Sequence, residues 1–313
     1  MSRPHRHNVA NRLQTGLILV AMAGLLMAVG YLLLGGSGLL WAGLGTAMLV
    51  GLNPMMSPGM ILRLYRSRRL TPRTAPDLVG LVERLAQRAG LATVPELHYV
   101  PSPIINAFAV GTRRASAVAV SHGLLRTLSP RELSGVLAHE ISHVAAGDTK
   151  VMMLADLFSR LTGLLSNLGQ ILLFLNLPLL LFSDYGIPWS LIILLILAPS
   201  VSVLLQLALS RAREYDADRA AAELTGDPRG LASALAKMER YQGGFFEQIV
   251  LPGRRVPEPS LLRTHPETED RVRRLLELEE RQPEESFPTS VLSALAAGPT
   301  PRPPRWRVPG IWY

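Results

Sequence analysis

Residues 128–148 read LSPRELSGVLAHEISHVAAGD, and the interpretation of the rest of the chain depends on this stretch. It begins like a helix, because Ser129 suits the N-cap, a proline takes the first helical position and Glu132 completes a capping box. The helix should run to about Ala146, where Gly147 breaks it. The stretch therefore predicts a helix with a defined start and end.

Two histidines on this helix indicate a metal site. His139 and His143 are four residues apart, so both imidazoles project from one face at a separation that a single zinc ion can bridge. Glu140 lies one step around the helix, where its carboxylate can reach a water on the metal rather than the metal itself. The pattern predicts a hydrolytic zinc site with Glu140 as general base. The alternative is two surface histidines on an ordinary helix.

A catalytic zinc ion usually has three protein ligands, so the third must come from elsewhere in the chain. The chain has no cysteine, which leaves His, Asp or Glu. Glu214, in the segment REYDAD, is the best candidate, because a helix is predicted to carry it out of the last apolar run. Asp218 lies one turn further on the same face, where it can accept a hydrogen bond from a ligand imidazole. The alternative is an ordinary charged helix face shared with Arg211, Arg213 and Arg219.

The composition indicates a membrane protein. Of the 313 residues, 48% are hydrophobic and the mean hydropathy is +0.24, which is too apolar for an ordinary soluble protein. Roughly 20 apolar residues suffice to cross a bilayer. A signal peptide is the alternative for the first run, and Asn53, Pro54 and Pro58 make the second the weakest. The four uncharged runs are Leu13–Leu34, Leu39–Leu62, Leu161–Ser183 and Ile187–Ser210.

The net charge of +8 is concentrated beside these runs. Residues 1–76 contain eight arginines and no acid, whereas residues 77–313 hold 24 basic and 24 acidic side chains. By the positive-inside rule, the N-terminus, the segment between the second and third runs and the C-terminus are cytoplasmic. A juxtamembrane excess also argues against nucleic-acid binding. The lack of cysteine suits a reducing compartment.

Outside the apolar runs, the sequence predicts helices and one small sheet. An amphipathic helix is expected over Pro76–Ala89, and three short runs predict strands. Later helices are expected from the fourth apolar run to Leu224, over Pro228–Tyr241 and, after a second capping box at Thr264 and Glu267, over Pro266–Glu280. The proline-rich tail from Arg281 is expected to be irregular. The predicted strands are Glu96–Val100, Ile104–Val110 and Ala117–Ser121.

Together these features predict a mainly α fold with a small β-sheet: a polytopic α-helical membrane protein with about four transmembrane helices and a zincin-like cytoplasmic catalytic domain. Six parts are expected. They are a cytoplasmic N-terminal segment (1–12), a transmembrane hairpin (13–62), a first catalytic part with the histidine helix (63–150), a second transmembrane hairpin (151–210), a second catalytic part with the third zinc ligand (211–280) and the proline-rich tail (281–313).

Four motifs carry a resemblance to a known family. AHEISHVAAGD, followed by a membrane hairpin and SRAREYDAD, with INAFAVG before them and THPETEDR after them, resembles the HtpX family of bacterial membrane proteases, relatives of the eukaryotic CAAX prenyl endopeptidases. The resemblance covers most of residues 1–280. It implies one Zn²⁺ per chain and the following roles: His139, His143 and Glu214 as ligands, Glu140 activating water, Asn106, Ala107 and Phe108 at a substrate-binding edge strand, and His265 and Arg271 near the reacting carbonyl.

Some of these roles have simpler alternatives. Asn106 can simply begin a strand whose following Ala107 and Phe108 belong to the core. An exposed edge strand can nevertheless bind an extended peptide through its backbone. His265 lies inside a predicted helix cap, so a purely structural role is the alternative there.

The expected activity is zinc-dependent hydrolysis of peptide bonds in membrane or membrane-associated proteins, at the cytoplasmic face of a bacterial inner membrane. The resemblance implies misfolded membrane or unfolded proteins as substrates, in quality control and stress response, with the lipid bilayer as the other partner and no nucleic acid. One alternative is a protease that cuts within the bilayer, although Arg131, Glu132, Asp148 and Lys150 bracket the motif here. Another is a membrane adaptor with a structural or vestigial zinc, although that site would not need Glu140.

Overall fold

The computed structural model describes residues 3–52, 58–175, 177, 189–248 and 268–281. The described residues form two compact units. The helical unit contains residues 3–52, 148–175, 177 and 189–214, and the sheet unit contains residues 58–147, 215–248 and 268–281. Helix α8 (Trp189–Thr225) belongs to both, because the division falls directly after Glu214.

Helix α1 (Arg3–Leu52) of the helical unit folds back on itself at Gly35, whose backbone is non-helical with φ 63° and ψ −143°. A Cβ on Gly30 would lie only 2.7 Å from the carbonyl oxygen of Gly38. In an unbroken helix these two positions would be about 12 Å apart. The two halves therefore form a hairpin with glycines at the contact, which is how membrane helices approach closely.

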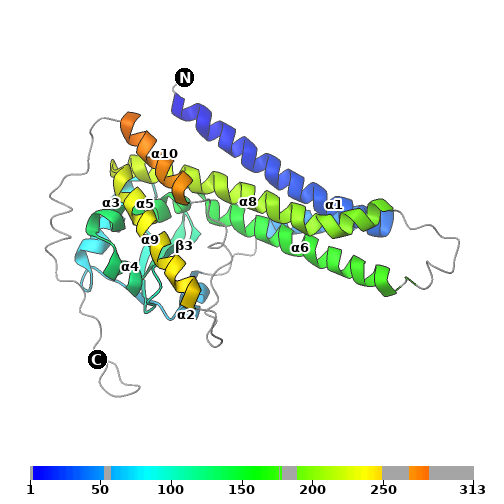
Figure 1. The fold of residues 1–313 in the computed structure, drawn as a ribbon, viewed down its shortest axis with the longest axis horizontal. Coiled ribbons are helices and arrows are strands. Elements are labelled where there is room, and N and C mark those ends of the chain that lie inside the picture. Colours follow the sequence, from blue (N-terminus) through cyan, green and yellow to red (C-terminus); the bar gives the residue numbers. More distant parts are fainter. Residues whose placement is uncertain (1–2, 53–57, 176, 178–188, 249–267, 282–313) are drawn as a thin grey trace, which may run out of the picture. The chain divides into compact units, whose positions relative to one another are not determined.

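The rest of the helical unit consists of α6 (Asp148–Leu175) and the first part of α8, both long helices in Figure 1. Among the described residues, two helices are long and apolar enough to cross a membrane by length and composition, Leu13–Met48 and Ser190–Thr225. The predicted run Leu161–Ser183 begins within α6 but extends beyond the described residues. The core joins all three helices through buried residues, namely Met22, Leu26, Met152, Ala155, Phe158 and Leu209.

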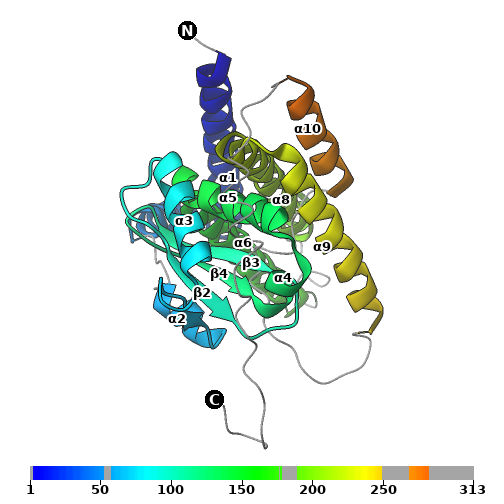
Figure 2. The same cartoon turned by 90° about the vertical axis from the view of Figure 1, so that its left-hand side faces the viewer.

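The sheet unit is built on four strands in the order β1-β2-β4-β3, which makes β3 an edge strand. β2 and β4 are parallel, and the outer pairs are antiparallel. Helices α3 and α5 cover one face and α2 covers the other, as Figure 2 shows. The strands are β1 (Arg68–Arg69), β2 (Glu96–Val100), β3 (Ala107–Thr112) and β4 (Ala115–Ser121).

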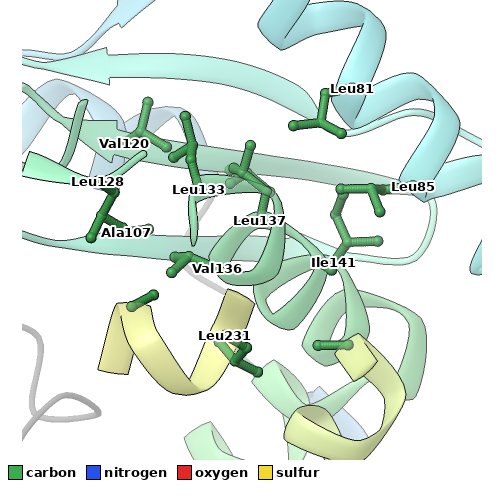
Figure 3. Close-up of a cluster of buried hydrophobic side chains, with 14 of the residues drawn as sticks. Leu81, Leu85, Ala107, Val120, Leu128, Leu133, Val136, Leu137, Ile141 and Leu231 are labelled. Atoms are coloured by element: carbon green, nitrogen blue, oxygen red, sulfur yellow. The ribbon is translucent and has the colours of Figure 1, made fainter. Parts of the chain in front are cut away.

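Two helices of this unit differ from the sequence prediction: α2 lies at the end of the predicted apolar run Leu39–Leu62 but packs on the sheet, and α4 was not predicted. The main core packs α3 and α5 on the sheet and adds Leu231 from α9, as Figure 3 shows. A smaller cluster on the opposite face holds Leu62 of α2 against Ala117 and Ala119 of β4. The helices are α2 (Pro58–Leu64), α3 (Pro76–Arg88), α4 (His122–Thr127), α5 (Pro130–Ala146), α9 (Pro228–Gln248) and α10 (Thr268–Arg281).

Several predicted elements differ by one or two residues at their ends, and two differ by three residues or more. The regular strand starts at Ala107 rather than at Ile104, because the chain bends at residues 103–104 and the backbone N–H of Asn106 donates to the Ser121 hydroxyl at 3.0 Å. Helix α9 continues past Tyr241 to Gln248. The predicted capping box at Thr264 and Glu267 lies outside the described residues, as does the tail after Arg281.

Candidate metal centre

Helix α5 has firm ends. The Ser129 side chain accepts from the backbone N–H of Glu132, and the Glu132 side chain accepts from the N–H of Ser129, so the predicted capping box is formed. Gly147 ends the helix in the left-handed conformation at φ 78°, a conformation that suits glycine. Both ends of the histidine helix are therefore fixed by local interactions.

Long-range contacts fix α5 against α9. The buried Glu132 carboxylate also accepts from Lys237 Nζ at 2.7 Å and from the Ser233 hydroxyl at 2.6 Å. Burial alone raises the pKa of Glu132, but the hydrogen bonds from Lys237, Ser233 and Ser129 lower it to about 2. Next to it, Arg131 donates to the Asp227 carboxylate at 2.6 Å. The start of α5 is thus tied to α9 and to Asp227, the residue directly before α9.

The two imidazoles on this helix converge on one point. The Nε2 atoms of His139 and His143 lie 3.1 Å apart, with the rings perpendicular. Zinc–nitrogen bonds of about 2.0–2.1 Å in tetrahedral geometry would place two ligand nitrogens roughly 3.3 Å apart. The observed separation therefore suits two imidazoles that share one metal ion.

The third predicted ligand joins them. One ligand atom each from His139, His143 and Glu214 lies within 4.8 Å of the others. His139 and Glu214 are buried, and His143 is partly buried. Two imidazoles and a carboxylate are a frequent protein donor set of catalytic zinc sites. The kinds of donor atom and their convergence on one point therefore fit a zinc ion.

A buried chain of polar contacts supports His139 from behind. The Nδ1 atom of His139 lies 3.0 Å from Oδ1 of Asp218. A proton on Nδ1 is favoured by that carboxylate and leaves the Nε2 lone pair for a metal. Arg271 of α10 donates two hydrogen bonds to the same carboxylate, at 2.6 and 2.7 Å. Asp218 thus contacts His139, and its role in orienting a metal ligand stays a prediction.

Glu140 is the remaining member of the motif. It lies next to His139 on α5 and is partly buried, whereas its neighbours on the core side of the helix are fully buried. Glu140 is therefore not part of the buried core. The position suits a base acting beside a metal.

A known protein family matches the part of the chain that holds this site. A model described as "Peptidase family M48" matches residues 72–279, which contain His139, Glu140, His143, Glu214, Asp218 and Arg271. The chain belongs to peptidase family M48. Membership makes it a metalloprotease, and the His139, His143 and Glu214 cluster is its candidate metal site.

Curated relatives of this M48 peptidase match over nearly their whole length. "Protease HtpX homolog" of Acaryochloris marina is 38% identical and that of Pyrococcus furiosus 37%, over 87% and 84% of this chain and 96% and 94% of theirs. The Methylibium petroleiphilum homologue is 33% identical over 85% of this chain and 97% of its own. The predicted resemblance to the HtpX family is confirmed. With two helices apolar enough to span a bilayer, the chain is a membrane metalloprotease.

One solved structure is also similar, the crystal structure of S. mikatae Ste24p. The match has 18% sequence identity and a TM-score of 0.41, and it covers 86% of this chain and 66% of that chain.

The structure places the other predicted residues of the M48 peptidase as follows. Asn106 precedes the edge strand β3, Ala107 is buried in the main core, and Phe108 is buried with its ring 5.0 Å from that of Tyr65. The Arg271 guanidinium contacts Asp218, so its predicted place near the reacting carbonyl stays a prediction. His265 lies outside the described residues.

Sequence reasoning missed a second buried ion pair. Its two residues lie near the proposed metal ligands in the sequence. Arg213, the residue before Glu214, donates to the Asp148 carboxylate at 3.1 Å and to the Thr15 hydroxyl of α1. Asp148 directly follows Gly147, where α5 ends. The sequence pattern assigns Arg213 only to a charged helix face. Its position directly beside the proposed third ligand was the available signal.

Proposed function

We propose that this chain is a zinc endopeptidase in which His139, His143 and Glu214 hold the ion and Glu140 is the general base. The observation that carries the proposal is the convergence of the three ligand atoms within 4.8 Å, with Glu140 next to His139 in the sequence. A structural metal site needs no base in this position. The motif therefore favours catalysis over an adaptor role.

The protein side of the reaction is proton transfer by Glu140. A bound zinc ion would supply a Lewis acid that lowers the pKa of water towards 7 and polarises the scissile carbonyl. The Glu140 carboxylate takes a proton from the attacking water and returns it to the departing amine. Asp218 and Arg271 keep the His139 ring in one tautomer and orientation throughout.

Extended segments of unfolded or membrane proteins are the proposed substrates, and β3 is the proposed docking strand. β3 pairs with β4 along one side, and the sheet order leaves it at the edge. An extended peptide can add to such an edge through backbone hydrogen bonds, which tolerates many sequences. The buried Ala107 and Phe108 side chains would then stabilise the strand rather than read the substrate.

The proposed topology is four spans with both termini and the active site in the cytoplasm of a bacterial cell. The α1 hairpin at Gly35 supplies two spans, and α6 with α8 supplies the others. Arginines flank the N-terminal side of the first span and follow the second, which the positive-inside rule places in the cytoplasm. A reporter fused after Tyr313 should report cytoplasm, and a periplasmic signal would contradict this topology.

The decisive comparison uses purified full-length wild type, Glu140→Gln, His143→Ala and the matched control Glu83→Gln, which changes an exposed glutamate of α3. Bound metal is measured by elemental analysis, and cleavage is measured on an unfolded membrane protein in detergent. We expect Glu140→Gln to keep zinc but lose at least ~10²-fold in rate, the usual contribution of a general base. His143→Ala should lose both the bound zinc and the cleavage activity.

Each result bears on one part of the proposal. Cleavage by Glu140→Gln at the wild-type rate would remove Glu140 from the mechanism. Full metal content in His143→Ala would contradict the ligand set. Wild type that binds zinc without cleaving any unfolded membrane protein would favour the adaptor alternative. Activity lost to a chelator and restored by Mn²⁺ but not Zn²⁺ would contradict the choice of metal.

A further inference from the structure

The sheet unit has a hollow on the face covered by α2, which is the opposite face from α5. We call it the α2-face pocket, and its volume is about 500 Å³. The peptidase chemistry does not use it. Its polar lining consists mainly of Arg63, Ser67, Thr93, Glu96, His98 and Arg114.

Two arginines give this pocket its positive charge. Arg63, at the end of α2, and Arg114, in the β3–β4 turn, are both exposed, and neither forms an ion pair among the described residues. A guanidinium offers forked N–H donors whose geometry matches phosphate. Two uncommitted guanidinium groups lining one hollow therefore favour an anionic ligand.

The one carboxylate of the lining is already compensated. Glu96 lies 3.1 Å from Arg69 and 3.3 Å from the Nε2 atom of His98. The other ring nitrogen of His98 lies 3.2 Å from the Ser67 hydroxyl. Glu96 thus has two partners, Arg69 and His98, and its repulsion of an anion held by Arg63 and Arg114 is reduced.

The position of Arg114 is set by the fold. The Thr93 hydroxyl donates to the backbone carbonyl of Arg113 at 3.0 Å and lies 3.1 Å from that of Arg114. This contact ties the loop before β2 to the β3–β4 turn. The arginine is therefore presented by an anchored backbone, which lowers the entropy lost when a ligand binds.

Apolar side chains adjoin the charged ones. Val94 lines the pocket and is 46% exposed, and Met60 and Leu64 of α2 are 54% and 63% exposed. Residues 58–73 contain five arginines and no acid. Exposed apolar residues beside clustered arginines are typical of surfaces that meet anionic lipids. In sequence, only residues 53–57 separate α2 from an apolar helix.

We propose that the α2-face pocket binds the phosphate of an anionic membrane lipid between Arg63 and Arg114, with Val94 at the pocket rim facing the lipid glycerol and acyl region. The proposal does not depend on the peptidase activity. Both membrane lipids and soluble ligands can carry a phosphate group. The adjoining apolar side chains, and the apolar helix that only residues 53–57 separate from α2 in the sequence, favour a lipid.

The test uses the full chain in nanodiscs. The chain has no cysteine, so Val94→Cys provides a single site for a bimane fluorophore. Quenching is titrated with phosphatidylglycerol or phosphatidylcholine that carries a nitroxide near the glycerol. We expect phosphatidylglycerol to reach half-quenching at about a tenfold lower mole fraction, the gain from one additional charge-assisted interaction.

Matched variants locate the effect. Arg63→Gln with Arg114→Gln should move the phosphatidylglycerol curve onto the phosphatidylcholine curve. Arg84→Gln with Arg126→Gln, two exposed arginines outside the pocket lining, removes the same charge and should leave the preference unchanged. Only variants with wild-type unfolding temperatures are compared. If the double variant does not fold, Arg114→Lys replaces it, and we then expect a partial loss of the preference for phosphatidylglycerol.

Three results would overturn the proposal. Equal quenching by both lipids would show no headgroup preference. Equal behaviour of the pocket and control pairs would mean that the effect is general surface charge. A change in bimane emission on adding millimolar inorganic phosphate in phosphatidylcholine nanodiscs, removed by Arg63→Gln with Arg114→Gln, would assign the pocket to a soluble phosphate instead.

Discussion

Arg271 donates two hydrogen bonds to Asp218, at 2.6 and 2.7 Å, and both side chains are buried. Asp218 in turn lies 3.0 Å from Nδ1 of His139. Three segments far apart in the chain, α5, the end of α8 and α10, are thereby joined at one proposed ligand. The sequence predicts no link between the third segment and Asp218, yet Arg271 of that segment places its guanidinium against the carboxylate.

Arg271→Met should weaken zinc binding by about 10- to 100-fold, the usual cost of losing a group that orients a ligand. Without the guanidinium, the buried carboxylate loses its fixed donors and holds the imidazole less firmly. Arg271→Lys should restore only part of the affinity, because a point charge cannot form the forked contact. Zinc affinity is measured by competition with a chromophoric chelator.

The control for Arg271 is Arg273→Met on the same helix, whose side chain is 64% exposed. Its zinc affinity should equal that of wild type. If Arg271→Met binds zinc as tightly as this control, Arg271 has no role at the metal site. A rate loss without an affinity loss would favour the predicted place near the reacting carbonyl.

Glu132 should make stability depend on pH in the acid range. Its folded pKa of about 2 lies below the ordinary value of 4.5, so the stabilisation is fully present above pH 4.5 and is lost as the pH falls from there towards 2. Glu132→Gln should lower the free energy of unfolding by roughly 1–3 kcal/mol at neutral pH, since Lys237 and the capping box lose a charged acceptor. Unfolding temperatures from pH 3 to 7 measure both effects.

The exposed residue Glu83 again supplies the comparison for Glu132. Glu83→Gln should follow the wild-type pH profile, whereas Glu132→Gln should flatten it between pH 3 and 4.5. A Glu132→Gln profile as steep as that of wild type would mean that other carboxylates control the acid transition.

Gly135→Ala should destabilise the sheet unit. A Cβ at this position would lie 2.8 Å from the backbone nitrogen of Leu231 and 2.9 Å from its Cα, so α5 and α9 would have to separate. Overpacking of this kind costs about 1–3 kcal/mol. Gly80→Ala is the control, because its Cβ would meet only the flexible end of Arg84 at 3.4 Å and alanine favours a helix. Thermal unfolding should show a lower unfolding temperature for Gly135→Ala than for Gly80→Ala. Equal unfolding temperatures would contradict the close contact between α5 and α9.

The Arg213–Asp148 ion pair should show strong coupling. Breaking a buried pair by removing one partner costs about 3–5 kcal/mol, because the other charge stays buried. Arg213→Met and Asp148→Leu should each destabilise strongly, and the double variant should cost less than their sum. Arg211→Met, at an exposed neighbouring position, should have little effect. Additive losses in unfolding measurements would show that the pair is not coupled.

Local features were predictable because the interactions that encode them lie within a few residues. The capping box at Ser129, the end of α5 at Gly147 and strand Glu96–Val100 all occur where the sequence predicted them. The start of β3 was misplaced by three residues, since it depends on the Asn106–Ser121 contact across the sheet. Hydrogen bonds between distant segments leave no periodic signal in the sequence.

The sequence by itself determined the metal-binding pattern, since a helix places His139 and His143 on one face whatever surrounds it. It also indicated the apolar runs and the family. Only the tertiary structure decided what those residues contact. It placed β3 at the sheet edge, Arg271 against Asp218, and Arg63 with Arg114 in one hollow. These relationships depend on how distant elements pack, and packing is set by the whole core rather than by any one stretch.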